Sequence, residues 1–149
     1  MAAVAQHSKG SFNWPVRVYY EDTDAGGVVY HSNYLKFIER ARTEWLRHLG
    51  FEHTYLRDTY HVMFVVHSMQ IAFKKPAKFN DLLNIVSDIT HIGHGSVEFL
   101  QKIQINQTSP LNQPNQQLLV QAQVKLACVD AITFKPVAVP KEISLKMQQ

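Results

Sequence analysis

Apolar residues recur at three- and four-residue steps between Asn33 and Leu49, and this period predicts one amphipathic α-helix. We expect Ser32 to cap its first turn and Gly50 to end it in a left-handed conformation. The expected apolar stripe comprises Leu35, Ile38, Ala41 or Arg42, Trp45, Leu46 and Leu49. Charged pairs are expected on the exposed side: Glu39 with Arg42, and Glu44 with Arg47 or His48.

Most of the remaining chain alternates apolar and polar positions, which predicts antiparallel strands. The turn at Gly93–Gly95 predicts a hairpin, and the polar, proline-containing segment Asn106–Gln117 predicts a surface loop. One long helix that covers a long antiparallel sheet is an α+β architecture. The expected strands cover residues 14–22, 61–74, 82–91, a stretch with Val97, Phe99, Ile103 and Ile105 on one face, 118–129 with Leu118 to Cys128 alternating inward, and a final short one in "ITFKPVAVP".

The length of 149 residues fits one domain, which we place at residues 14–143 between an N-terminal tail (1–13) and a C-terminal tail (144–149). Apolar runs do not exceed five residues, so no transmembrane helix is expected. The first residues lack the apolar stretch of a signal peptide, and the chain holds one cysteine, Cys128. Both features favour a cytoplasmic protein. Because Cys128 lies in an apolar strand pattern, we expect it to be buried and structural.

The formal net charge of +3 suits a small anionic ligand without demanding nucleic acid. In "FKKPAKFND", Lys74 and Lys75 could contact phosphate groups, although a solvated strand end would show the same residues. The histidines are not spaced as a metal-ligand set, and no dinucleotide or phosphate-binding glycine motif is present. We therefore expect no metal and no cofactor.

The stretch "EDTDAGGVVYH" carries the strongest chemical signal. Asp24 follows a predicted strand and lies seven residues before His31, at the predicted helix start. A helix N-terminus offers free N–H groups that can polarise a carbonyl oxygen, and a nearby carboxylate can act as nucleophile or general base. Gly26 and Gly27 would let a ligand approach the backbone. Spacing alone leaves open that Asp22 or Asp24 only caps a turn.

The longer stretch "VRVYYEDTDAGGVVYHSNYLKFIERARTEWL" resembles the signature of hot-dog-fold thioesterases of the 4-hydroxybenzoyl-CoA thioesterase type. More narrowly, it is similar to the acyl-CoA thioesterases associated with the bacterial Tol–Pal system. "PAKFNDLL" and "ACVDAITFKPVAVP" extend the resemblance over about Pro15 to Pro140. It implies that Asp24 is the catalytic nucleophile or general base. It also implies that the N–H of His31 polarises the thioester carbonyl, while its side chain assists.

The resemblance further implies an acyl-CoA hydrolase of lipid metabolism, with CoA as part of the substrate. Homodimers or homotetramers with active sites at the subunit interface are typical of such proteins, and a position peripheral to the inner membrane is compatible with them. Two alternatives stay open at this point. One is a 3-hydroxyacyl-thioester dehydratase that uses His31 and Glu39. The other is a non-catalytic module that binds acyl carrier protein or acyl-CoA.

Overall fold

The computed structural model describes residues 10–108 and 114–148. Within them, five strands and a few helices follow one another along the chain. Their order is β1 (Phe12–Arg17), the 3₁₀ turn η1 (Tyr20–Asp22), α2 (His31–His48), α3 (His53–Tyr55), the π turn η2 (Leu56–Tyr60), β2 (Val62–Phe73), β3 (Leu82–Ile92), β4 (Ser96–Thr108), β5 (Pro114–Asp130) and α4 (Lys141–Met147).

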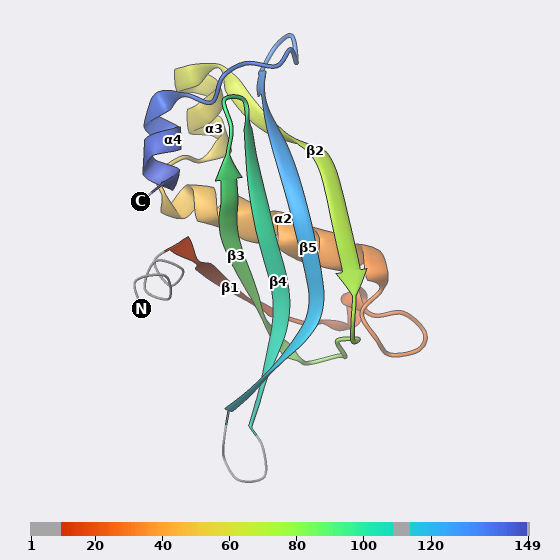
Figure 1. Cartoon of the computed structure of the whole chain (residues 1–149). Helices are drawn as coiled ribbons and strands as arrows, with labels where there is room; N and C mark the ends of the chain where they lie inside the picture. Colours follow the sequence, from red (N-terminus) through yellow and green to blue (C-terminus); the bar gives the residue numbers. More distant parts are fainter. Residues whose placement is uncertain (1–9, 109–113, 149) are drawn as a thin grey trace.

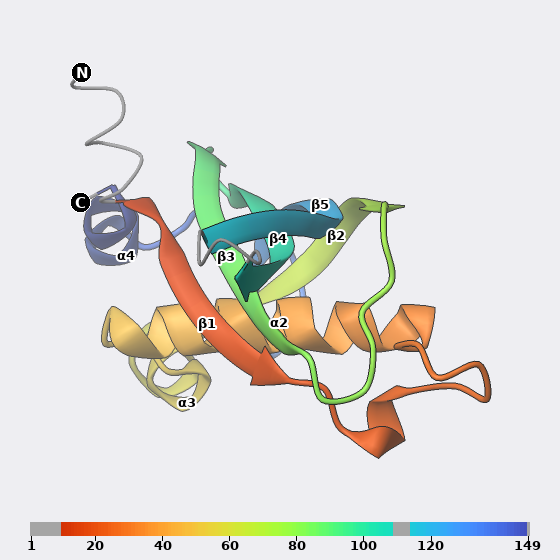
Figure 2. The ribbon, with the colours of Figure 1, turned by 90° about the horizontal axis from the view of Figure 1, so that it is seen from below.

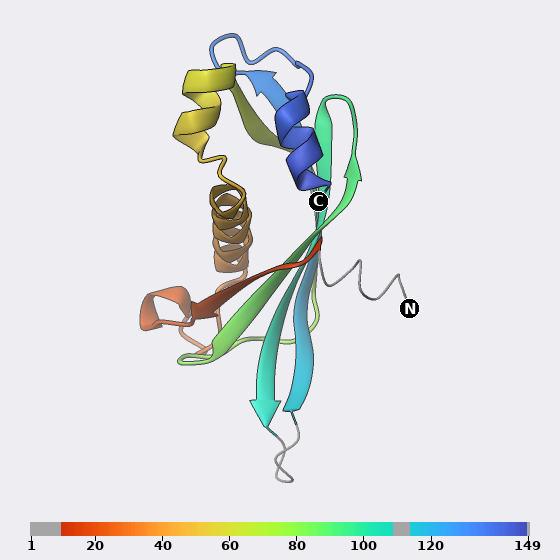
Figure 3. The same ribbon diagram turned by 90° about the vertical axis from the view of Figure 1, so that its left-hand side faces the viewer.

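The strands form one antiparallel sheet in the order β1-β3-β4-β5-β2. Helix α2 runs across one face of this curved sheet, as the three views of the ribbon show (Figure 1, Figure 2 and Figure 3). The predicted α+β architecture is therefore confirmed. Among the described residues, no helix has the length and apolar character needed to span a membrane.

The core lies between α2 and the sheet because α2 turns its apolar stripe toward the inward side chains of the strands. The ring of Trp45 meets that of Phe99 edge to face, with centroids 5.3 Å apart. Leu35, which was predicted to belong to the apolar stripe, is exposed, whereas Phe37, which was not, is buried. The buried residues of α2 are Tyr34, Phe37, Ile38, Ala41, Arg42, Trp45 and Leu46.

A buried polar group interrupts this apolar core at the middle of α2. Arg42 donates to the side-chain oxygen of Gln101 at 3.0 Å, and Gln101 donates to Ser87 at 2.9 Å and to the carbonyl of Ile38 at 3.1 Å. The predicted surface pair of Glu39 with Arg42 is wrong because Arg42 turns inward and is only 6% exposed. Burial lowers the pKa of Arg42.

The C-terminal end of α2 agrees with the prediction, whereas its N-terminal end does not. The helix begins at His31, and its N-cap residue is Tyr30, with no side-chain hydrogen bond to the first turn. The prediction of Ser32 as N-cap is therefore wrong. At the other end Gly50 has φ +94°, which confirms the left-handed termination. Glu44 and Arg47 form the predicted surface ion pair at 2.5 Å.

The first strand is shorter than its alternating pattern predicts. Strand β1 ends at Arg17, whereas the pattern continues to residue 22. The reason is local, since the carboxylate of Asp22 accepts the backbone N–H of Tyr19 at 2.8 Å and closes a 3₁₀ turn over Tyr20–Asp22. Strands β2 and β3 and the hairpin at Gly93 confirm the prediction.

The predicted loop Asn106–Gln117 is largely strand. Strand β4 continues to Thr108 and pairs there with Pro114 of β5, so only residues 109–113 of that prediction lie outside the described residues. The pairing of β4 with β5 contains a bulge: Ile103 pairs with Val120 and Gln104 with Leu118, which leaves Leu119 unpaired between them. Because of this bulge Leu119, not Leu118, is fully inward, while Val120, Ala122, Val124, Leu126 and Cys128 are buried as predicted.

The C-terminal part ends in a helix and not in the predicted short strand. The carboxylate of Asp130 accepts the N–H groups of Ile132 and Thr133 at 2.8 Å each, which turns the chain away from the sheet. Only an isolated bridge between Val129 and Pro136 remains of that strand. Helix α4 crosses the predicted domain limit at residue 143, where Ile143 is fully buried, and β1 begins inside the predicted tail 1–13.

Candidate active site

The glycine-containing stretch forms a tight loop at the N-terminal end of α2, at the edge of the molecule in Figure 2. The N–H of Asp24 donates to the carbonyl of Val28 at 2.9 Å, and the N–H of Gly27 donates back to the carbonyl of Asp24 at 3.0 Å. A bridge between Thr23 and Val29 closes the base of the loop. Gly27 has φ +83°, a conformation that favours glycine.

The loop presents the carboxylate of Asp24 at the surface. Its Oδ1 accepts the N–H of Gly26 at 2.8 Å, and the side chain is exposed. A Cβ on Gly26 would lie 3.2 Å from Oδ1, which is tighter than an ordinary contact. Gly26 therefore provides both a hydrogen bond and free space for this carboxylate.

The neighbouring acid Asp22 is held inside the framework of the loop. Besides the turn bond to Tyr19, its carbonyl oxygen accepts the N–H of Tyr30 at 2.9 Å and the side-chain amide of Asn33 at 3.1 Å. Both acids therefore close a turn, Asp22 through the N–H of Tyr19 and Asp24 through the N–H of Gly26. Among the described residues, the bond from Gly26 is the one hydrogen bond of the Asp24 side chain, and it lies within the loop.

Helix α2 starts beside this loop, with His31 as its first residue. Within the described chain no side chain caps the first turn, which leaves backbone donors there for water or a ligand. The turn also contains no acidic residue that would neutralise the positive end of the helix dipole. The imidazole of His31 is exposed, 4.4 Å from the ring of Tyr30 and edge-on to Phe73 at 6.3 Å.

A hollow of about 250 Å³ opens at this helix start. The structure brings His31, Lys74 and Lys75 together around it, whereas Asp24, Gly26 and Gly27 lie in the adjoining loop and do not line it. The N–H groups of Lys74 and Lys75 both donate to the carbonyl of Leu119, at 2.8 and 3.1 Å. The hollow is lined by Val29, His31, Tyr34, Phe73, Lys74, Lys75 and Pro76.

Tyr34 lines this hollow although the sequence did not predict it as a site residue. Tyr34 lies one turn after His31, and its hydroxyl accepts the N–H of Ala77 at 3.0 Å. Burial raises the pKa of Tyr34, the bond from Ala77 opposes this, and the negative charges of Asp81 and Asp24 raise the pKa further. A tyrosine in an apolar helix stripe has the pattern of a core residue, so only the fold could reveal this contact.

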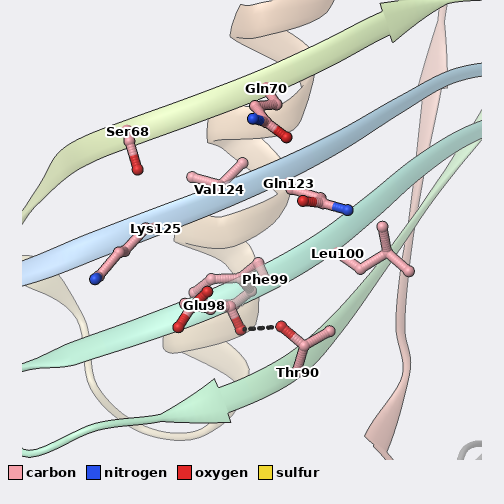
Figure 4. A pocket seen from close by; sticks show the side chains of 9 residues that line it. All are labelled: Ser68, Gln70, Thr90, Glu98, Phe99, Leu100, Gln123, Val124 and Lys125. Carbon is pink, nitrogen blue, oxygen red and sulfur yellow. Dashed lines mark hydrogen bonds between the residues drawn. The ribbon is translucent and has the colours of Figure 1, made fainter.

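A larger hollow, of about 440 Å³, lies on the sheet with α2 behind it (Figure 4). Glu98 and Lys125 face each other across β4 and β5, and Thr90 donates to the carbonyl of Glu98 at 3.2 Å. The hollow lies on the strands, away from the loop of Asp24, and it joins no helix terminus to a carboxylate. We therefore place the candidate site at the start of α2. Over the described residues, no group of three or more His, Cys, Asp or Glu is arranged to hold a metal ion.

Comparison with known proteins relates the chain to a family of enzymes. Residues 18–147 match the Thioesterase-like superfamily. The acyl-CoA thioester hydrolase YbgC of Escherichia coli O6:H1 is 46% identical over 138 residues, which cover 93% of this chain and 96% of the relative. A probable thioesterase from Bartonella henselae is 34% identical, with a TM-score of 0.76 over 87% of this chain and 99% of its own. A 4-hydroxybenzoyl-CoA thioesterase in complex with 4-hydroxybenzoyl-CoA has a TM-score of 0.83 at 18% identity over 93% of this chain and 99% of its own.

Proposed function

Because the chain belongs to the Thioesterase-like superfamily and has its hot-dog fold, we propose that it hydrolyses acyl-CoA to a carboxylic acid and CoA. One observation supports this most strongly. An exposed carboxylate, Asp24, is presented by a glycine loop that leads directly into the uncapped start of α2 at His31. A carboxylate and free amide donors are the groups that attack on a thioester carbonyl requires.

In the proposed mechanism the thioester carbonyl oxygen accepts the backbone N–H of His31. As the tetrahedral intermediate forms, negative charge on this oxygen is stabilised by that donor and by the helix dipole. Asp24 either attacks the carbonyl carbon itself or removes a proton from the attacking water. The C–S bond then breaks, and the thiolate leaves and takes up a proton. If water attacked, this is the proton that Asp24 removed; if Asp24 attacked, a water molecule then hydrolyses the acyl–Asp24 anhydride, which releases the carboxylic acid and restores Asp24. The imidazole of His31 lies exposed at the same helix start and would orient water or carry that proton.

A thiol-release assay over acyl-CoAs of different chain lengths tests the proposal. We expect turnover by the wild type and a loss of about a thousandfold or more in kcat for Asp24→Asn, as when an essential catalytic group is removed. Glu21→Gln is the matched control, since it removes an exposed carboxylate three residues away and should keep full activity. No turnover on any acyl-CoA, or full activity in Asp24→Asn, would refute the mechanism. An enoyl absorbance without free thiol would instead indicate the dehydratase, and binding without either product would indicate the binding module.

We also propose that Lys74 and Lys75 contact the phosphates of CoA. Both line the hollow at the helix start, and the bonds of their N–H groups to Leu119 fix the backbone from which the two side chains extend. Changing both lysines to alanine should raise KM for acyl-CoA about tenfold. The same change should leave KM unaltered for the matching acyl N-acetylcysteamine thioester, which carries no nucleotide. Equal effects on both substrates would contradict the assignment.

We propose that two copies pair through β2. This strand has 12 residues and lies at an edge of the sheet, where its outer hydrogen-bonding groups are open to another strand. Val66 and Phe73, both 50% exposed, lie on it, and Phe73 lines the hollow. Pairing at this edge would bring the partner to the active site. Light scattering after size-exclusion chromatography should give a dimer or tetramer mass, and a monomer mass would contradict it.

We propose a cytoplasmic hydrolase that needs no metal or redox cofactor, does not bind nucleic acid and acts close to lipid synthesis at the inner membrane face. Acyl carrier protein is the second thiol carrier to test, because the net charge of +3 suits an acidic protein. Comparing turnover of one acyl group on CoA and on acyl carrier protein would show which thiol the enzyme prefers.

A further inference from the structure

The hydroxyl of Tyr34 joins α2 to the segment that supports the Asp24 loop. Tyr34 Oη accepts the backbone N–H of Ala77 at 3.0 Å, and the carbonyl of Ala77 accepts the N–H of Val29 at 2.9 Å. Val28 and Lys78 form a bridge directly beside these residues. A continuous chain of hydrogen bonds therefore runs from the helix, through Ala77, to the end of the loop.

All three members of this chain are buried. Tyr34 is 3% exposed, Ala77 0% and Val29 4%. Water cannot easily replace a partner at such a place, so removal of the hydroxyl would leave the Ala77 N–H buried without an acceptor. Another connection between loop and helix, from the side chain of Asn33 to the carbonyl of Asp22, is only partly buried. The Tyr34 connection is thus the more buried of the two.

The charge of Tyr34 also suits this role. Because burial raises its pKa, and the charges of Asp81 and Asp24 raise it further, the hydroxyl is neutral at physiological pH. A neutral hydroxyl holds the Ala77 N–H without placing a second negative charge beside Asp24.

We propose that Tyr34 is a positioning residue, whose hydroxyl acts through Ala77 and Val29 to hold the Asp24 loop in register with the start of α2. Its catalytic consequence rests on the proposed function, since Asp24 and the His31 N–H must reach the same carbonyl. A misplacement of about 1 Å between such groups costs roughly a hundredfold in rate. The connection itself is a property of the fold and can be measured without any substrate.

Tyr34→Phe removes the hydroxyl and keeps the ring against Phe37 and Phe73. We expect amide hydrogen exchange to accelerate about tenfold in peptides that cover residues 24–30 and 76–78, and not elsewhere. We expect kcat to fall about 10- to 100-fold with little change in KM. Tyr34→p-aminophenylalanine keeps a nitrogen lone pair that can accept the Ala77 N–H, so it should partly restore both the slow amide exchange and kcat.

Tyr60→Phe is the matched control. Its hydroxyl hydrogen-bonds to Glu142 of α4, so the change removes the same group at a place outside the loop and its supports. This variant should lose thermal stability without faster exchange in residues 24–30 and without a lower kcat. Unchanged exchange of the loop in Tyr34→Phe, or equal loss of kcat in both variants, would overturn the proposal. If the wild type released no thiol while Tyr34→Phe still accelerated exchange in both segments, the proposed function would fail and the positioning contact would stand.

Discussion

Gly26→Ala changes the position of the proposed catalytic carboxylate with little effect on the fold. The new Cβ would lie 3.2 Å from Asp24 Oδ1, whereas ordinary contacts of a Cβ begin at 3.4 Å. The carboxylate must therefore move away by a few tenths of an ångström. Because Gly26 and Asp24 are both exposed, we expect less than about 0.5 kcal/mol of lost stability.

The expected loss of rate follows from that displacement. If a misplacement of 1 Å costs about a hundredfold, a shift of about 0.2 to 0.4 Å lowers kcat about three- to sixfold. Gly27→Ala should behave differently. Its Cβ would meet no atom within 4 Å, but the backbone at Gly27 has φ +83°, a conformation that alanine rarely adopts. There the cost is backbone strain of about 1–2 kcal/mol, which appears as lower stability of the loop.

The assay is kcat at saturating acyl-CoA, measured together with the thermal midpoint Tm. Gly10→Ala is the control, since its Cβ would meet no atom within 4 Å and the backbone there is not in the left-handed region. We expect a lower kcat at unchanged Tm for Gly26→Ala. Full activity of Gly26→Ala would show that the placement of Asp24 Oδ1 does not limit the reaction.

Three further predictions concern the framework. Ser32→Ala should leave stability within about 0.5 kcal/mol of wild type in a thermal melt, because Ser32 does not cap α2. A loss of about 1 kcal/mol or more would show that Ser32 does cap the helix. Gln101→Leu should cost about 2–4 kcal/mol in urea unfolding, because it leaves the buried Arg42 without its acceptor, and a loss below about 1 kcal/mol would refute this. Burial raises the pKa of Cys128 to about 11, so its thiol should stay protonated at pH 8. We expect it to react with a disulfide reagent only after unfolding, and rapid reaction of the native protein would contradict this.

Local patterns predicted the elements whose signals are repeated over many residues. Helix α2 and strands β2 to β5 follow from periodicity, and Gly50 ends α2 as expected. Two of the errors occurred where one side chain redirects the backbone. Asp22 ends β1 through its bond to Tyr19, and Asp130 converts a predicted strand into a turn. Such a bond depends on the rotamer of one side chain, and the periodicity of apolar residues carries no information about that rotamer.

Arg42 shows a second limit of the sequence. Its position three residues after Glu39 suggests a surface ion pair, yet its guanidinium lies in the core against Gln101 of β4. The partner comes from a strand 59 residues away, so local spacing could not identify it. The same reason hid the contact of Tyr34 with Ala77, 43 residues apart. Local spacing cannot identify such long-range contacts, whether they lie in the core, as that of Arg42, or at the site, as that of Tyr34.

The two acids beside the glycines illustrate how the structure sharpens a chemical prediction. Spacing alone left open that Asp22 or Asp24 only caps a turn. The structure gives Asp22 the bonds to Tyr19, Tyr30 and Asn33. The carboxylate of Asp22 is the acceptor that closes the 3₁₀ turn, whereas the carboxylate of Asp24 accepts the N–H of Gly26 and is exposed. This difference supports our proposal that Asp24 is the catalytic carboxylate, and replacement of Asp24 is the decisive experiment.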